Sequence, residues 1–221
     1  MNPDQLPAPV RAILFDFGLV LSAPPNPLAW DRMRSVTAIA AEPFERAYWA
    51  HRHAYDSGHL SGRSYWQLIA AEAGLPVLSS ENLNSLYDAD TDVWTDLNLP
   101  MAEWAQSLQR ARIPTAILSN IGDEMEAGVL RKHPWLSAFH HITWSHRLRT
   151  AKPDPAIYRH AADGLGVPPF NILFVDDKLE NIEAARTCGM QTIQYSTHPR
   201  FVEEMNYRGF GTLLADPPRL T

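Results

Sequence analysis

The sequence has little cysteine and no long apolar run. Its single cysteine among 221 residues, Cys188, cannot form a disulfide within the chain, so the fold does not depend on an oxidising compartment. No segment approaches the roughly 20 consecutive apolar residues that cross a bilayer. The first residues, MNPDQLPAPVR, lack the basic start of a signal peptide and contain Asp4. We therefore expect a soluble, cytoplasmic protein without a membrane partner.

An excess of basic residues is also missing. Lysine and arginine number 19 against 25 aspartates and glutamates, so the formal net charge is −6 and the sequence pI is about 5.8. Such a chain has no overall positive field to attract nucleic acid or anionic lipid. Hydrophobic residues make up 45% of the sequence, enough for a sizeable core. Nucleic acid is therefore not expected as a partner.

The hydrophobic pattern changes character twice along the chain. Residues 12–21, AILFDFGLVL, begin with a short apolar run typical of a buried strand and end in a glycine-containing turn. Residues 24–94 show helical spacing, and after residue 99 helices alternate with short strands. This alternation predicts an α/β fold, a doubly wound, Rossmann-like parallel sheet. The later strands are expected at residues 114–120, 140–144, 172–177 and 190–196.

The helical block interrupts the sheet after its first strand. We therefore predict a core domain of residues 1–22 and 96–221, with residues 23–95 inserted as a helical cap. Ligands of parallel α/β sheets bind outside the carboxyl ends of the strands. An insertion that leaves from one of these ends should overhang the binding site.

Polar residues occur at four strand ends or adjoining loops: Asp16, Ser119 with Asn120, Lys152, and Asp176 with Asp177. Each alone is explained as a turn former or helix cap. Parallel topology, however, brings the strand ends to one edge of the sheet, so the four places should meet. Their convergence indicates a functional site.

This set of residues resembles the motifs of the haloacid dehalogenase-like hydrolases. ILFDFGLVL matches the strand that ends in the nucleophilic aspartate, Asp16, and AILSN matches the strand that ends in a hydroxyl, Ser119. AKPDPAIY supplies the motif lysine, Lys152, and FVDDKLENIEAA supplies the acidic pair, Asp176 and Asp177. The helical insertion resembles the family's small α-helical cap.

The resemblance implies a role for each of these residues. Asp16 is expected to be both nucleophile and ligand of Mg²⁺, with the main-chain carbonyl of Gly18 and one acid of the pair as further ligands. Asp177 is the first choice for that acid, and Asp176 then orients the metal's waters. Lys152 neutralises the phosphoryl charge. Ser119 and Asn120, with nearby main-chain N–H groups, bind the phosphoryl oxygens.

The chain departs from the family pattern at Gly18, where phosphatases of this family usually carry an acid/base aspartate. General acid–base catalysis contributes about 10² to 10⁴ in rate. Three outcomes are compatible with its absence: a leaving group that departs unprotonated, as from an acyl phosphate; a proton from the cap; or binding with little turnover. The cap histidines His51 and His53 are candidates, although their side chains point about 200° apart on a helix.

A 2-haloacid dehalogenase also lacks the second aspartate and needs no metal. Such enzymes generally do not keep the acidic pair found here as Asp176 and Asp177, which favours a metal-dependent reaction. We therefore expect a Mg²⁺-dependent hydrolase of a small phosphorylated metabolite, a phosphate monoester or acyl phosphate, that forms an aspartyl phosphate at Asp16. A phosphate-binding protein with little turnover ranks second and a dehalogenase third. The cap is expected to select the substrate.

Overall fold

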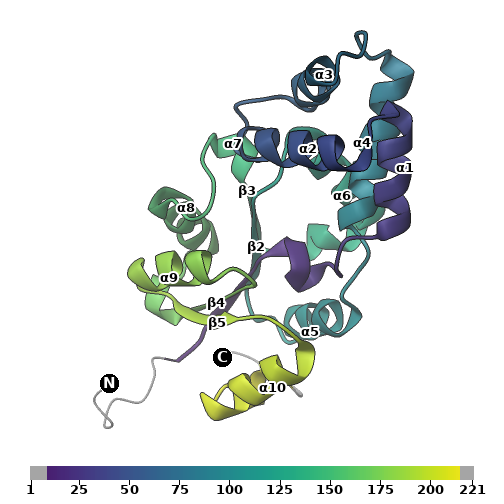
Figure 1. The fold of residues 1–221 in the computed structure, drawn as a ribbon. Coiled ribbons are helices and arrows are strands. Elements are labelled where there is room, and N and C mark those ends of the chain that lie inside the picture. Colours follow the sequence, from purple (N-terminus) through teal and green to yellow (C-terminus); the bar gives the residue numbers. More distant parts are fainter. Residues whose placement is uncertain (1–8, 215–221) are drawn as a thin grey trace.

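A five-stranded parallel sheet forms the centre of the molecule, as predicted. The computed structural model describes residues 9–214. The strand order is β3-β2-β1-β4-β5, so the first strand lies in the middle. The strands are β1 (Ala12–Phe15), β2 (Thr115–Ser119), β3 (His141–Trp144), β4 (Ile172–Asp176) and β5 (Gln191–Gln194). This is the doubly wound α/β fold (Figure 1).

Helices cover both faces of the sheet because successive strand residues point to opposite sides. Ile13 and Phe15 face a cluster that includes Trp104, whereas Leu14 faces the cluster that contains Tyr158. The first face is covered by α5 (Leu99–Arg110), α6 (Asp123–Lys132) and α10 (His198–Tyr207). The second is covered by α8 (Pro155–Leu165) and α9 (Leu179–Thr187). The short α7 (Ser145–Leu148) follows β3.

Four helices lie within the stretch predicted to be the cap. They are α1 (Pro27–Thr37), α2 (Ala41–Asp56), α3 (Gly62–Glu72) and α4 (Ser80–Trp94). Serines cap two of them: Ser61 accepts a hydrogen bond from the amide of Ser64, and Ser79 accepts one from Asn82. Their side chains form one hydrophobic cluster, separate from the two that flank the sheet.

The end of α2 rests on the carboxyl edge of the sheet (Figure 1). The hydroxyl of Tyr55 accepts a hydrogen bond from the amide of Met125, and Ser145 donates one to the main-chain carbonyl of Asp56. Met125 and Ser145 lie beyond the ends of β2 and β3. The end of α2, within the predicted cap, therefore contacts the segments that follow β2 and β3 at this edge of the sheet. Within residues 9–214, none of the helices has the length and apolar character required to cross a membrane.

Candidate active site

The ends of β1 and β4 bring three carboxylates together. Asp16 directly follows β1, Asp176 is the last residue of β4, and Asp177 follows it. Each offers one oxygen, and these three oxygens lie within 4.8 Å of one another. The structure thus joins residues 160 positions apart in the way that the parallel topology predicts.

Lys152 connects two of these acids. Its ammonium nitrogen lies 2.8 Å from Oδ1 of Asp16 and 2.7 Å from Oδ2 of Asp176, and the residue is only 4% exposed. Burial alone lowers the pKa of a lysine, but the two carboxylates outweigh it and raise the pKa of Lys152 above its usual value. The lysine therefore stays protonated and holds Asp16 in place.

The two oxygens of Asp16 have different surroundings. Oδ1 accepts a hydrogen bond of 2.7 Å from the amide of Phe17, besides its contact with Lys152. Oδ2 has no partner among the residues that the structure describes. Burial, together with the charges of Asp176 and Asp177, raises the pKa of Asp16 to about 7, although Lys152 opposes the shift. One oxygen is fixed and the other is free to attack an electrophile or to bind a cation.

The acids of the tandem pair differ in the same way. Asp176 is fully buried and accepts hydrogen bonds from Lys152, from the side chain of Asn181 and from the amide of Lys178. The carboxylate of Asp177 is half-buried and accepts no hydrogen bond from any other described residue. Burial and the neighbouring Asp176 raise the pKa of Asp177. Asp177 is the member of the pair that is available to a ligand.

The charge of this cluster suits a divalent cation. Three carboxylates carry three negative charges when ionised and Lys152 carries one positive charge, which leaves two negative charges. Mg²⁺ prefers such hard oxygen ligands. Asp16 and Asp177 have the free oxygens that could hold it, and the carbonyl of Gly18 lies in the same loop.

Ser119 and Asn120 lie beside this cluster at the end of β2. Ser119 is 5% exposed, and its hydroxyl has no hydrogen-bond partner in the described part of the chain. Asn120, which we predicted to bind substrate, uses both ends of its amide on the main chain of Lys152: its oxygen accepts from the Lys152 amide at 2.8 Å, and its nitrogen donates to the carbonyl at 3.0 Å. This geometry supports a role for Asn120 in positioning the lysine.

The backbone at Gly18 leaves room for a side chain. A Cβ atom built there meets no atom within 4 Å, and the backbone is extended (φ −63°, ψ 131°). The next residue, Leu19, has a positive φ of 57° in the left-handed region, and its amide donates to the hydroxyl of Ser22. The position of the missing acid is therefore open, not filled by another group.

The cap histidines do not fill this gap. His51 bonds Glu72 through Nε2 at 2.7 Å, and His53 is exposed on the same helix. The same helix, α2, ends at a carboxylate that the sequence analysis did not single out, Asp56. Arg52 donates to its carboxylate at 2.9 and 3.0 Å. Burial raises the pKa of Asp56 to about 6, and the charge of Lys178, the residue after Asp177, acts in the opposite direction.

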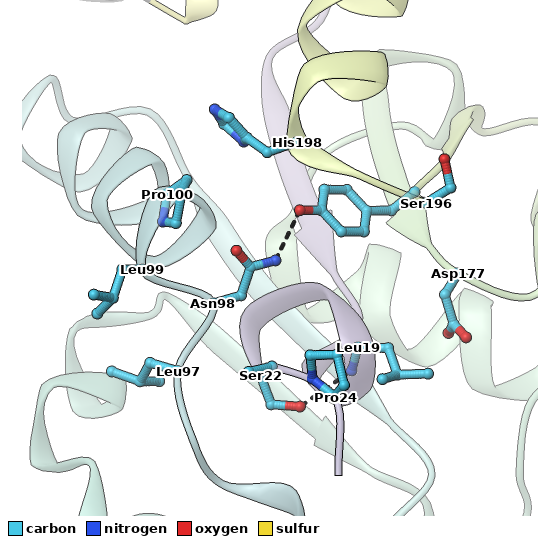
Figure 2. Close-up of a pocket in the computed structure, with 12 residues that line it drawn as sticks. Leu19, Ser22, Pro24, Leu97, Asn98, Leu99, Pro100, Asp177, Ser196 and His198 are labelled. Atoms are coloured by element: carbon cyan, nitrogen blue, oxygen red, sulfur yellow. Dashed lines mark hydrogen bonds between the residues drawn. The ribbon is translucent and has the colours of Figure 1, made fainter. Parts of the chain in front are cut away.

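A cavity of about 720 Å³ adjoins the acidic cluster (Figure 2). Asp177 and Leu19 lie on one side of it, and Asn98 and His198 lie on the other. Tyr195 also lines it. The side-chain amide of Asn98 donates to the hydroxyl of Tyr195 at 2.8 Å. Asn98 lies where the chain returns from the predicted cap, Tyr195 directly follows β5, and His198 begins α10. The sequence analysis missed them, although polar residues after β5 repeat the signal seen after the other strands.

Comparison with known proteins agrees with this fold. A model of the family described as haloacid dehalogenase-like hydrolase matches residues 10–189. The chain belongs to this family, as the motifs around Asp16, Ser119, Lys152 and Asp176 predicted. It is therefore related to hydrolytic enzymes.

Relatives within the family carry out different reactions. The chain is 29% identical over 195 residues to (S)-2-haloacid dehalogenase 1 of Pseudomonas sp. (strain CBS-3), covering 84% of each chain. It is 25% identical over 189 residues to phosphatase MT3486 of Mycobacterium tuberculosis, covering 82% of this chain and 85% of the phosphatase. A longer relative, bifunctional epoxide hydrolase 2 of Sus scrofa, is 26% identical over 207 residues. The match covers 83% of this chain but spans only 36% of that protein.

A solved structure shares the fold. The enzyme bt-2542 of Bacteroides thetaiotaomicron, a haloacid dehalogenase family protein, was solved in complex with magnesium and inorganic phosphate. It matches with a TM-score of 0.70 at 19% identity, over 86% of this chain and 96% of that one. At this identity the likeness establishes the architecture. The reaction has to be argued from the site.

Proposed function

We propose that the protein is a Mg²⁺-dependent hydrolase of a small phosphorylated metabolite and that it forms an aspartyl phosphate at Asp16. The observation that carries this proposal is the charge cluster itself. Asp16 keeps one oxygen free while Lys152 holds the other, and Asp177 offers a second free carboxylate within the same 4.8 Å group. A reaction at carbon needs no such surplus of carboxylates.

The first step breaks the bond between phosphorus and the leaving group. A carboxylate oxygen of Asp16 attacks phosphorus, and the leaving group departs with the electron pair of its bond. Lys152 and the Ser119 hydroxyl are placed to stabilise the phosphoryl oxygens. Asp16, Asp177 and the Gly18 carbonyl would hold Mg²⁺, which supplies neutralising charge when bound. Water then attacks phosphorus, and phosphate and free Asp16 are restored.

The leaving group of an ester needs a proton donor, and Gly18 has no side chain that could donate the proton. An acyl phosphate releases a carboxylate that needs no proton. A phosphate monoester needs a proton, which a group of the cap would have to supply, whereas acyl phosphates react without one.

The dehalogenase relative makes 2-haloacid hydrolysis the competing function. The acidic pair favours phosphate chemistry, since displacement of halide from carbon has no use for a group of carboxylates that can bind a cation. The phosphatase relative and the magnesium and phosphate complex of the structural neighbour also support phosphate. We place the enzyme in the cytoplasm, with a small phosphorylated substrate and with no nucleic-acid or membrane partner. If no hydrolysis is found, the alternative function is phosphate binding with little turnover.

The test is hydrolysis of acetyl phosphate and para-nitrophenyl phosphate by wild type, Asp16→Asn and Gly18→Asp, with Mg²⁺ or with chelator. Metal-dependent turnover that Asp16→Asn abolishes is expected. Because position 18 is open, Gly18→Asp should fit and should raise the rate of the ester relative to acetyl phosphate, by up to about 10²-fold. Chloride release from a 2-chloro acid, without phosphate release, would contradict the proposal.

A further inference from the structure

The residues that line the 720 Å³ cavity beside Asp177 indicate which kind of ligand fits it. It lies on the core side of the cap connections, between the chain segments that leave and re-enter the core, which pair through a bridge between Ser22 and Leu97. Its volume falls within the usual range of about 300 to 1,000 Å³ for small-molecule sites. A cavity of this size can receive an organic group larger than a phosphate.

The cavity borders two of the candidate catalytic loops. Asp177 contributes to its wall, and Leu19, which directly follows Gly18, contributes another part. In Figure 2 the Leu19 side chain extends toward Asp177, so both belong to the side of the cavity nearest the acidic cluster. A phosphoryl group bound at Asp16 and Asp177 would therefore have this cavity as a neighbour.

The walls of the cavity are mainly apolar. Leucine, proline and alanine side chains from both cap connections contribute: Leu19, Ala23, Pro24, Leu97, Leu99 and Pro100. The described lining contains no lysine or arginine, and its only carboxylate is Asp177. A negatively charged group would meet no fixed positive partner there. The lining suits an uncharged, largely apolar group.

A few polar groups on the far wall have unused hydrogen-bonding capacity. The Tyr195 hydroxyl accepts from Asn98, but its own proton has no acceptor among the described residues. The Asn98 side-chain oxygen likewise accepts no hydrogen bond in the described part of the chain, because its recorded side-chain bonds are both donated by the nitrogen. These groups could orient one polar atom of a bound ligand.

We propose that this cavity, rather than the cap alone, receives the leaving group of the substrate, and that this group is uncharged and largely apolar. The inference rests on the proposed phosphatase function and adds the substrate class: monophosphates of apolar alcohols. It assigns specificity to the segments 97–100 and 195–198 of the core.

The experiment compares 1-naphthyl phosphate with acetyl phosphate, whose small leaving group does not need the cavity. Ser196 lines the cavity and is exposed, so Ser196→Trp should narrow it. Thr197→Trp adds the same bulk one residue later, outside the lining, and is the matched control. We expect Ser196→Trp to lower the ratio of kcat/KM for naphthyl phosphate to that for acetyl phosphate by roughly tenfold, mainly through KM. The control should change the ratio less than twofold.

Calorimetric titration with 1-naphthol, the alcohol product, tests the cavity without any turnover. Wild type and Thr197→Trp should bind it alike, and Ser196→Trp should bind it roughly tenfold more weakly. Ala23→Phe, which fills the cavity from another wall, replaces Ser196→Trp if that variant does not fold. An unchanged substrate ratio together with unchanged naphthol binding would overturn the inference. If neither phosphate is hydrolysed, the proposed function fails, and the naphthol titration alone decides whether the cavity binds an apolar group.

Discussion

Two buried groups of charge can be compared within this molecule. At the sheet edge, Lys152 pairs with Asp16 and Asp176. In the cap, Arg52 pairs with Asp56 and Asp90. Each places one cation between two carboxylates in a largely buried position.

The two groups differ in what their oxygens do. In the cap, Asp90 accepts from Tyr48 and from Arg52, Asp56 accepts from Arg52 with both oxygens, and aromatic rings surround the guanidinium. At the sheet edge, Oδ2 of Asp16 and the carboxylate of Asp177 lack partners among residues 9–214. Both groups consist of one cation and its carboxylates. In the cap, the carboxylates are fully hydrogen-bonded and hold helices together. At the sheet edge, unpaired carboxylate oxygens remain available for a reaction.

The largest expected effect comes from removing the cation at the sheet edge. Lys152→Met should lower kcat for acetyl phosphate by about 10³-fold, because it removes the charge that faces the phosphoryl group and fixes Asp16. Circular dichroism should show a folded protein in the presence of Mg²⁺. A variant that keeps more than a tenth of the activity would contradict this role of the lysine.

Removal of the cation in the cap should act on stability instead. Arg52→Met leaves Asp56 and Asp90 without their partner in a buried position and should lower the free energy of unfolding by about 3 to 5 kcal/mol, measured in urea. Arg46→Met, on the same helix, is the control. Its partner Glu42 and its own side chain are exposed, so it should cost less than about 0.5 kcal/mol. An equal loss of unfolding free energy in Arg52→Met and Arg46→Met would contradict a stabilising role for the buried Arg52 group.

The carboxylate of Asp56, a member of the cap group, should make the stability depend on pH. Its pKa in the folded protein is about 6, above the ordinary 3.8, so the folded state binds the proton more tightly. The resulting stability is complete below pH 3.8 and is lost as the pH rises through 6. Asp56→Asn should not show this loss. The difference in free energy of unfolding between wild type and variant should therefore change by on the order of 2 kcal/mol between pH 4 and pH 7. If the free energies of unfolding of wild type and Asp56→Asn, measured in urea, differ by the same amount at every pH, the raised pKa of Asp56 is contradicted.

The smallest effect concerns the hydroxyl of Tyr48, which donates to Asp90 and accepts from Trp94 and Arg52. Tyr48→Phe leaves these buried groups with one partner fewer and should cost about 1 to 2 kcal/mol of stability. Tyr207→Phe, at a side chain that is 87% exposed, should have no measurable effect. Thermal unfolding of both variants distinguishes the results.

The parts of the fold that could be predicted from sequence are those with local signals. Short apolar runs gave the five strands, and the polar residues after them gave Asp16, Ser119 and Asp176, because parallel strands end at one edge. The serines that cap α3 and α4, Ser61 and Ser79, are local signals of the same kind. These features depend on neighbours along the chain.

The remaining features depend on contacts between distant segments. The contact of Asn120 with the Lys152 main chain, the pairing of Arg52 with Asp90 and the cavity between Leu19 and Tyr195 join residues that no short pattern relates. The cap histidines were considered for acid catalysis because of their residue type. The structure shows His51 engaged with Glu72 and places Asp56 at the edge instead. Side-chain direction on a helix decided that difference.

The most direct test of the account is mass spectrometry of the tryptic peptide 12–32 after wild-type protein has been mixed with acetyl phosphate and Mg²⁺ and quenched in acid. Without a carboxylate at position 18 to activate water, the aspartyl phosphate should hydrolyse slowly and accumulate. A phosphoryl group is expected on Asp16 in wild type and none in Asp16→Asn. Turnover of acetyl phosphate without phosphorylation of this peptide, or with full activity in Asp16→Asn, would contradict it.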